Sequence, residues 1–148
     1  MRIIPMNEQH ISDIARLEQL CFSQPWSADG LRAELNNTKA HFLTAVTEND
    51  SVAGYIGMHQ ILDEGYIANV AVFPEYRGQK VASRLIAELQ KLPNLSFISL
   101  EVRVSNLAAI ALYEKMGFVR AGIRRGFYSA PAEDGLIMTW NSKGDAEI

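Results

Sequence analysis

The sequence contains one cysteine, Cys21, and three widely separated histidines, His10, His41 and His59. A single cysteine excludes an internal disulfide, and a structural zinc site needs clustered Cys and His ligands. We therefore expect no metal and no disulfide. Cys21 lies at helical spacing from neighbouring apolar residues, which favours a place in the core over a role as an acyl-carrying nucleophile.

Long apolar runs are also missing. No run approaches the ~18 residues that span a bilayer, and the N-terminal MRIIPMNEQH lacks the apolar stretch of a secretory signal. The formal net charge of −3 has the wrong sign for a general nucleic-acid binder. We therefore expect a cytoplasmic protein, monomeric, with no direct contact to membrane or nucleic acid.

No linker, repeat or low-complexity tract divides the 148 residues, of which 48% are hydrophobic and 21% charged. This length and composition are typical of one globular domain with an adequate core. We assign residues 1–140 to a single domain. Residues 141–148, NSKGDAEI, are expected to form a polar C-terminal tail.

Strand and helix patterns alternate along the chain. Helices are expected to begin after the capping residues Asn7 and Ser27, over 81–92, and after Asn106, with Gly117 ending the last. Strands are expected at 2–6, 41–47, 52–62, 66–73, 97–102, 118–123 and 136–140. The order β-α-α-β-β-β-α-β-α-β-β predicts an α/β fold, a mixed sheet covered by helices on both faces.

The segment 69–83, NVAVFPEYRGQKVAS, carries the clearest chemical signal. An apolar strand leads through a proline turn and a basic, glycine-containing loop into an amphipathic helix. Free N–H groups at the start of such a helix form a generic phosphate site, and Arg77, Lys80 and Arg84 add positive charge. The segment matches neither the P-loop nor the dinucleotide motif. Spacing alone therefore favours an ordinary surface loop that caps a helix.

The stretch NVAVFPEYRGQKVASRLI resembles the acyl-CoA-binding motif of the Gcn5-related N-acetyltransferase (GNAT) family, Arg/Gln-x-x-Gly-x-Gly/Ala. Arg77 matches the first position of the motif and Ala82 the last. Lys80 stands where the family usually has glycine. We expect a right-handed helical backbone at Lys80, because a left-handed one would strain a lysine.

A second stretch, SLEVRVSNLAAIALYEKMGF at 99–118, is similar to the family pattern LEV…N-x-x-A-x-x-x-Y-x-x-x-G-F. Three further segments resemble the RimI-type branch of the family: LEQLCFSQPWS, DEGYIANVAV and GIRRGFYSAPAEDGLIM. That branch acetylates the N-terminal alanine of a small-subunit ribosomal protein. The resemblance covers nearly the whole chain except the tail, and it implies the GNAT fold.

The resemblance implies acetyl-CoA as co-substrate. The strand at 69–72 is then expected to bind the pantetheine and to splay away from the strand at 97–102, while 78–83 bind the pyrophosphate. The implied acetyl-CoA-binding residues are Val70, Ala71, Val72, Arg77, Gly78, Gln79, Lys80, Val81, Ala82, Ser83 and Asn106. One N–H of the strand can also stabilise the tetrahedral oxyanion.

Two residues match the catalytic positions of the family. Glu101 interrupts an apolar strand, and the resemblance implies that it takes the proton of the acceptor amine. The spacing of residues alone is equally consistent with a solvent-facing Glu101 on a strand whose side chains alternate between two faces. Tyr113 matches the general acid that protonates the leaving thiolate, although a helical tyrosine is more often a core residue.

The resemblance places Tyr66 and Tyr128 at the substrate entrance. It implies direct acetyl transfer, in a ternary complex, to the N-terminal segment of a ribosomal protein. One alternative keeps the fold but uses a small-molecule amine or lysine side chains as acceptor. Another, of a different class, is a non-catalytic CoA-binding regulatory module, for which Lys80 is the only support.

Overall fold

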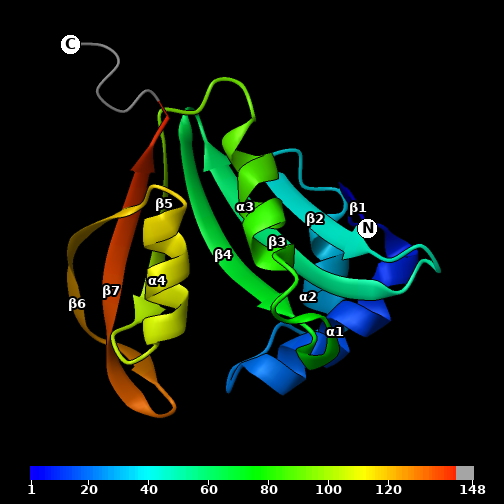
Figure 1. Cartoon of the computed structure of the whole chain (residues 1–148), viewed down its shortest axis with the longest axis horizontal. Helices are drawn as coiled ribbons and strands as arrows, with labels where there is room; N and C mark the ends of the chain where they lie inside the picture. Colours follow the sequence, from blue (N-terminus) through cyan, green and yellow to red (C-terminus); the bar gives the residue numbers. More distant parts are fainter. Residues whose placement is uncertain (143–148) are drawn as a thin grey trace.

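The computed structural model describes residues 1–142, which form one seven-stranded sheet with helices on both faces (Figure 1). The strands are β1 (Arg2–Pro5), β2 (Ala40–Val46), β3 (Val52–Ile61), β4 (Glu64–Val72), β5 (Phe97–Arg103), β6 (Val119–Ser129) and β7 (Ala132–Asn141). The helices are α1 (Ile11–Cys21), α2 (Ala28–Glu34), α3 (Val81–Gln90) and α4 (Leu107–Lys115), with short 3-10 turns at Glu8–His10 and Pro74–Tyr76. The predicted order of elements is confirmed. No helix in this described range is long and apolar enough to cross a bilayer.

The strand order is β1-β2-β3-β4-β5-β7-β6. All neighbouring strands are antiparallel except β4 and β5, which run parallel. That parallel pair is short, because only 64–66 of β4 pair with 97–99 of β5. Beyond these residues the two strands diverge, and the sheet opens at its centre (Figure 1). The splay implied by the family resemblance is therefore present.

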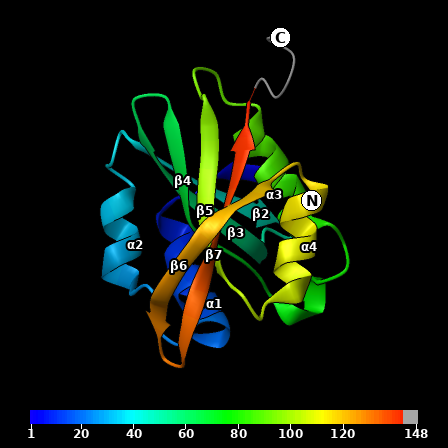
Figure 2. The same ribbon diagram turned by 90° about the vertical axis from the view of Figure 1, so that its left-hand side faces the viewer.

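Alternating side chains divide the core into two layers. In β3, Ile56 and Met58 pack with α3, whereas the preceding residue, Tyr55, packs with α1 on the other face. Helix α4 belongs to the same layer as α3, and α2 to the layer of α1. Figure 2 shows α2 and α4 on opposite sides of the sheet. Strand β3 is thus covered on both faces, which fixes its register firmly.

The expected caps are present. The side chain of Asn7 accepts a hydrogen bond from the Gln9 N–H, that of Ser27 from the Gly30 N–H, and that of Asn106 from the Ala109 N–H. Each occupies one donor that the first turn of a helix leaves free. These short-range signals are why the sequence locates the helix starts well.

The last hairpin is longer than predicted. Strand β6 extends to Ser129 and β7 begins at Ala132, so a tight turn replaces the expected loop. Strand β6 is an edge strand exposed along almost its whole length, and it therefore lacks the apolar alternation that marks a buried strand. The predicted tail also starts too early. Asn141 pairs with Phe97, the Ser142 N–H donates to the Ser96 carbonyl, and only 143–148 lie outside the described residues.

His10 is buried at the start of α1, where its Nδ1 accepts a hydrogen bond from the Asn7 N–H at 3.2 Å. Burial lowers the pKa of His10 below its usual value. Neutral His10 therefore contributes fully to the free energy of unfolding above the unfolded-state pKa of about 6.5. This contribution is lost as the pH falls toward the folded-state pKa and the imidazole gains a proton.

We expect His10→Gln to lose less stability than the unmodified protein between pH 7 and pH 5, because glutamine keeps the capping acceptor without titrating. Urea unfolding at both pH values measures this difference. Equal losses in the two proteins would contradict the role of His10.

Candidate active site

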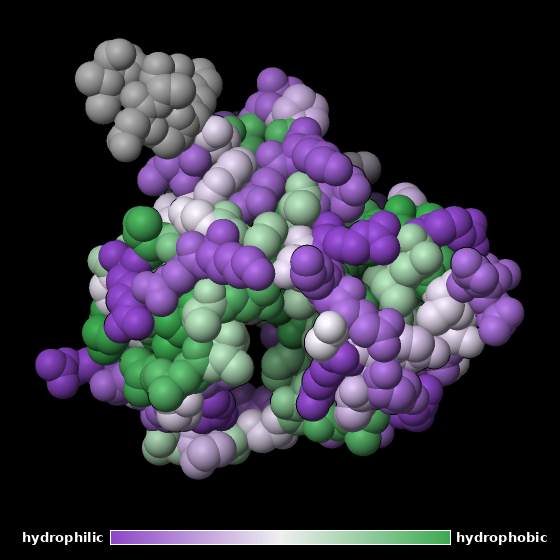
Figure 3. All heavy atoms as spheres, viewed as in Figure 1, coloured by the Kyte–Doolittle hydropathy of each residue, from purple (hydrophilic) through white to green (hydrophobic). Residues whose placement is uncertain are grey.

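A cavity of about 820 Å³ occupies the space where β4 and β5 diverge. Residues 67–72 of β4 line one wall and 100–103 of β5 the other, and side chains of α4 complete the cavity. Figure 3 shows an opening near the middle of this face, bordered largely by hydrophobic side chains. The cavity therefore presents an apolar slot with a few polar groups, the usual character of a small-molecule site.

A β-bulge in β4 creates one wall of the cavity. Ile67 pairs with Met58 and Asn69 pairs with Gly57, which leaves Ala68 without a partner on β3. A bulge bends a strand and redirects the side chains that follow it. Past the bulge, the edge of β4 that faces β5 has no pairing strand, so its backbone groups are available to an extended ligand, except the Val72 carbonyl, which accepts a hydrogen bond from Arg77 Nε.

Glu101 lies on the opposite wall. Its neighbours Leu100 and Val102 are buried in the core, and Glu101 lies on the other face of β5 with Ser99 and Arg103. The side chains of β5 therefore alternate between the two faces of the sheet, as expected for a solvent-facing Glu101 without a catalytic role. The side chain nevertheless lines the cavity, with 28% of its surface exposed, and Oε1 accepts a hydrogen bond from Arg124 Nη1 on β6 at 2.8 Å.

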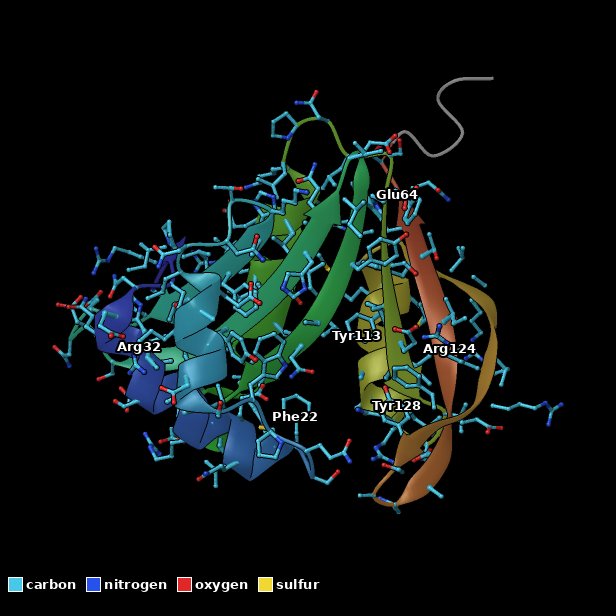
Figure 4. All side chains as sticks on the ribbon, turned by 180° about the vertical axis from the view of Figure 1, so that it is seen from behind. Phe22, Arg32, Glu64, Tyr113, Arg124 and Tyr128 are labelled. Atoms are coloured by element: carbon cyan, nitrogen blue, oxygen red, sulfur yellow. The ribbon has the colours of Figure 1, made fainter. Side chains whose placement is uncertain are left out.

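Two tyrosines line the cavity beside Glu101. Tyr113 on α4 is buried and packs against Phe118 with ring centroids 5.8 Å apart, and burial raises the pKa of its hydroxyl. Tyr128 on β6 is half-buried beneath the Arg103 guanidinium, which lies 4.3 Å from the ring centroid. Figure 4 shows both tyrosines on the β5–β7 side of the opening, with Phe22 across from them. A phenol and a carboxylate therefore share one cavity.

The loop between β4 and α3 differs from expectation at one residue. Lys80 has φ 64° and ψ 24°, and Gly78 has φ 79°. The prediction of a right-handed backbone at Lys80 is wrong, because the chain enters α3 through a left-handed residue. The Lys80 carbonyl accepts the first helical hydrogen bond, from the Arg84 N–H, so that backbone geometry is tied to the start of the helix. The N–H groups of 81–83 have no helical acceptor and remain available to an anion.

We expect Lys80→Gly to raise the free energy of unfolding by about 1 kcal/mol, because glycine adopts a left-handed backbone without strain. Lys80→Ala is the control, since it removes the same charge but keeps the Cβ. Urea unfolding compares the three proteins. CoA affinity measured by calorimetry should change less than tenfold in Lys80→Gly. If the glycine variant were no more stable than the alanine variant, strain at this position would be excluded.

The structure brings most of the predicted site residues to one place. Those that line the cavity are Val70, Ala71, Val72, Arg77, Ala82, Glu101, Asn106, Tyr113 and Tyr128. Gly78, Gln79, Lys80, Val81 and Ser83 belong to the adjoining loop and the first turn of α3. The sequence did not single out Phe22, Asn69 or Arg103, which also line the cavity. Each lies in a segment that resembles the family, but none of them is a position that the family motifs specify.

Two predicted residues have other contacts. The structure does not bring Tyr66 to the cavity: its hydroxyl donates to Glu64 Oε1 at 2.6 Å, and its ring packs edge-on against Phe97. Arg77 lines the cavity, but its Nε donates to the Val72 carbonyl at 3.1 Å and its Nη2 lies 3.6 Å from Cys21 Sγ. Arg77 therefore holds the loop against β4 and α1 as well as adding charge.

Residues 11–118 match the Acetyltransferase (GNAT) family. The chain belongs to this family. It is 37% identical over 128 residues to the Escherichia coli (strain K12) [ribosomal protein bS18]-alanine N-acetyltransferase, covering 82% of this chain and 84% of that protein. It is 39% identical over 137 residues to a Bacillus subtilis (strain 168) protein provisionally given the same name, covering 90% of each.

Solved structures agree with this assignment. The crystal structure of the E. coli ribosomal-protein-S18-alanine N-acetyltransferase superposes with a TM-score of 0.84 at 29% identity, covering 95% of this chain and 92% of that one. The Arabidopsis thaliana NAA60 structure in complex with acetyl-CoA has a TM-score of 0.87 at 19% identity, covers 97% of this chain and 99% of that one, and supports the fold.

This GNAT acetyltransferase uses acetyl-CoA as its acetyl donor. The described residues fit that molecule: an unpaired strand edge lies beside a narrow apolar cavity, and the start of α3 follows directly. The edge can bind the pantetheine amides, and the N–H groups of 81–83 can bind the pyrophosphate. Among residues 1–142, no group of three or more His, Cys, Asp or Glu side chains could hold a metal ion.

Proposed function

We propose that this acetyltransferase transfers the acetyl group of acetyl-CoA to the N-terminal α-amino group of a protein, with the N-terminal alanine of a small-subunit ribosomal protein as acceptor. The observation that carries the proposal is the placement of Glu101 and Tyr113 in the cavity that separates β4 from β5. The named activity of the relatives that are 37–39% identical supports the choice of acceptor.

The chemistry is a direct transfer within a ternary complex. The acceptor nitrogen attacks the thioester carbonyl carbon, forming the C–N bond, and the C–S bond then breaks. Glu101 accepts the proton that the amine loses, directly or through one water molecule. A backbone N–H of 70–72 stabilises the oxyanion, and Tyr113 gives a proton to the departing sulfur.

The shape of the cavity supports a small first residue. The loop that follows α1 reaches the β6–β7 hairpin, where Gln24 Nε2 donates to Ser129 Oγ at 3.2 Å. Phe22 and Tyr128 line the cavity on either side of the opening (Figure 4).

An α-amine has a pKa of about 7.7–8.0, against about 10.4 for a lysine side chain, so the α-amine is the easier nucleophile to deprotonate.

The charges of the cavity do not favour a polyamine. Among the described residues that line it, Glu101 is the single acid, whereas Arg77 and Arg103 are basic. A polycationic acceptor would therefore meet two guanidinium groups and one carboxylate. We further infer a cytoplasmic monomer without direct nucleic-acid contact. The net charge of −3 supports the absence of nucleic-acid contact, which binding assays test, and gel filtration tests the monomeric state.

The test is acetylation of an alanine-led peptide that copies the N-terminus of the ribosomal protein and contains one internal lysine. Mass spectrometry locates the acetyl group, which we expect only on the α-nitrogen. The same peptide with a blocked N-terminus, and spermidine, are the controls. Transfer to lysine or spermidine alone would refute the proposed acceptor.

A further inference from the structure

Glu18 on α1 is a buried carboxylate that the proposed chemistry does not use. The residue is 0% exposed. It accepts hydrogen bonds from the Trp26 N–H at 2.8 Å, from the Tyr55 hydroxyl at 2.5 Å, and from Asn69 Nδ2 at 3.1 Å to each oxygen. These donors come from the segment before α2, from β3 and from β4.

The contacts of Glu18 suit its ionised form. A backbone N–H and an amide NH₂ can only donate, and a carboxylate without a proton can only accept. Burial raises the pKa of Glu18, while these hydrogen bonds act in the opposite direction. No Lys, Arg or His of residues 1–142 forms an ion pair with Glu18. Buried charges are normally paired, and the only partners of the Glu18 carboxylate among the described residues are these neutral hydrogen-bond donors.

Asn69 connects this carboxylate to the cavity. It follows the bulge residue Ala68 and lines the cavity wall. Because Nδ2 is held by Glu18, the amide cannot turn over without pointing Oδ1 at a carboxylate. No described residue donates to Asn69 Oδ1. Thr44 Oγ1 is the one fully enclosed side-chain polar atom without a partner in residues 1–142, so Asn69 Oδ1 keeps some accessible surface, and Asn69 is a residue of the cavity wall.

Asn69 and Glu101 lie on the same face of the sheet. Asn69 contacts Glu18 of α1, and Glu101 lies on the face of β5 opposite the side chains that pack with α3 and α4. They belong to the two strands that form facing walls of the cavity. An amine that reached both side chains could donate one N–H to each of them.

We propose that Asn69, oriented by Glu18, binds the α-amino group of the acceptor. The inference rests on the proposed function, which supplies an α-amine as acceptor. The carbonyl oxygen of Asn69 takes a hydrogen bond but no proton, so it orients the amine while Glu101 removes the proton. The buried charge of Glu18 favours the ammonium form on entry. Asn69 is a binding residue in this scheme, and Glu18 is a positioning residue.

The test uses Asn69→Ala and Glu18→Gln, with Tyr55→Phe as control. Tyr55→Phe also removes a hydrogen bond to Glu18, but Tyr55 lies outside the cavity. We expect both test variants to lower kcat/KM for the alanine-led peptide about tenfold or more, with the KM for acetyl-CoA within threefold of normal. Tyr55→Phe should retain peptide kcat/KM within about twofold. Glu18→Gln keeps the size of every side chain and provides the same test if Asn69→Ala fails to bind acetyl-CoA.

A second measurement separates amine recognition from a structural role. Calorimetry on the enzyme–CoA complex compares the alanine-led peptide with a peptide in which a propionyl group replaces the N-terminal alanine. The two peptides differ only in the α-amine. The unmodified enzyme should favour the amino peptide about tenfold or more, and Asn69→Ala should remove most of that preference. If Asn69→Ala weakened the binding of both peptides equally, or kept full activity, the proposed role of Asn69 would be overturned while the proposed function would stand. If the unmodified enzyme acetylated no α-amine, the proposed function would fail, and the subsite with it.

Discussion

Replacing Glu101 with glutamine is expected to lower kcat/KM for the alanine-led peptide about 100-fold or more at pH 7, with no change in acetyl-CoA affinity. General-base catalysis contributes about 10² to 10⁴ in rate, and glutamine cannot take a proton. Glu101 lies on the wall of the cavity opposite β4, so the substitution leaves the acetyl-CoA-binding edge and the loop before α3 intact. Steady-state kinetics and calorimetry measure the two quantities separately.

The Glu101→Gln defect should shrink as the pH rises. The α-amine has a pKa of about 7.7–8.0, so above pH 9 most of it is already neutral and needs no base to become a nucleophile. Glu114→Gln is the matched control, because Glu114 is an α4 carboxylate bound to Arg120 outside the cavity. A defect of equal size from pH 6.5 to 9.5 would contradict proton removal by Glu101 and leave it a positioning role.

Short-range chemistry explains what the sequence predicts well. Asn7, Ser27 and Asn106 cap helices through hydrogen bonds to N–H groups two or three residues away. Apolar spacing identifies the faces of α1 and α3 that become buried. These signals are local, so they yield the order of elements without any knowledge of tertiary contacts.

Contacts between distant residues explain what the sequence does not predict. The bulge at Ala68 exists through the register of β4 against β3, and no local signal marks it. Glu18 and Asn69 are 51 positions apart, and each alone resembles an ordinary polar residue. Lys80 shows a further limit, because its side chain disfavours the left-handed backbone that the entry into α3 adopts.

The candidate site also has one part that the sequence predicts and another that it does not. The family resemblance supplies Glu101 and Tyr113, and the structure places both in one cavity. It also implies a place for Tyr66 at the substrate entrance, but Tyr66 lies in the short stretch of β4 that still pairs with β5, and the cavity wall begins at the next residue, Ile67. A family motif identifies which residues have a role. Which residues of a strand line the cavity depends on how that strand pairs with its neighbours.

Replacing Tyr113 with phenylalanine is expected to lower kcat for the same peptide about tenfold to 100-fold, again without affecting acetyl-CoA affinity. Burial raises the pKa of the Tyr113 hydroxyl, so this group keeps its proton over the whole working range of pH. The proton is therefore available whenever negative charge develops on the departing sulfur. Phenylalanine retains the packing against Phe118 but has no proton to give.

The Tyr113→Phe defect should be independent of pH between 6.5 and 9, because the raised pKa keeps the phenol un-ionised throughout that range. This behaviour distinguishes it from Glu101→Gln, whose defect shrinks as the amine loses its proton. Tyr55→Phe is the control for loss of a buried hydroxyl, since Tyr55 is buried outside the cavity. If Tyr113→Phe kept more than half of the normal kcat, Tyr113 would be a core aromatic residue of α4, and the sulfur would take its proton from solvent.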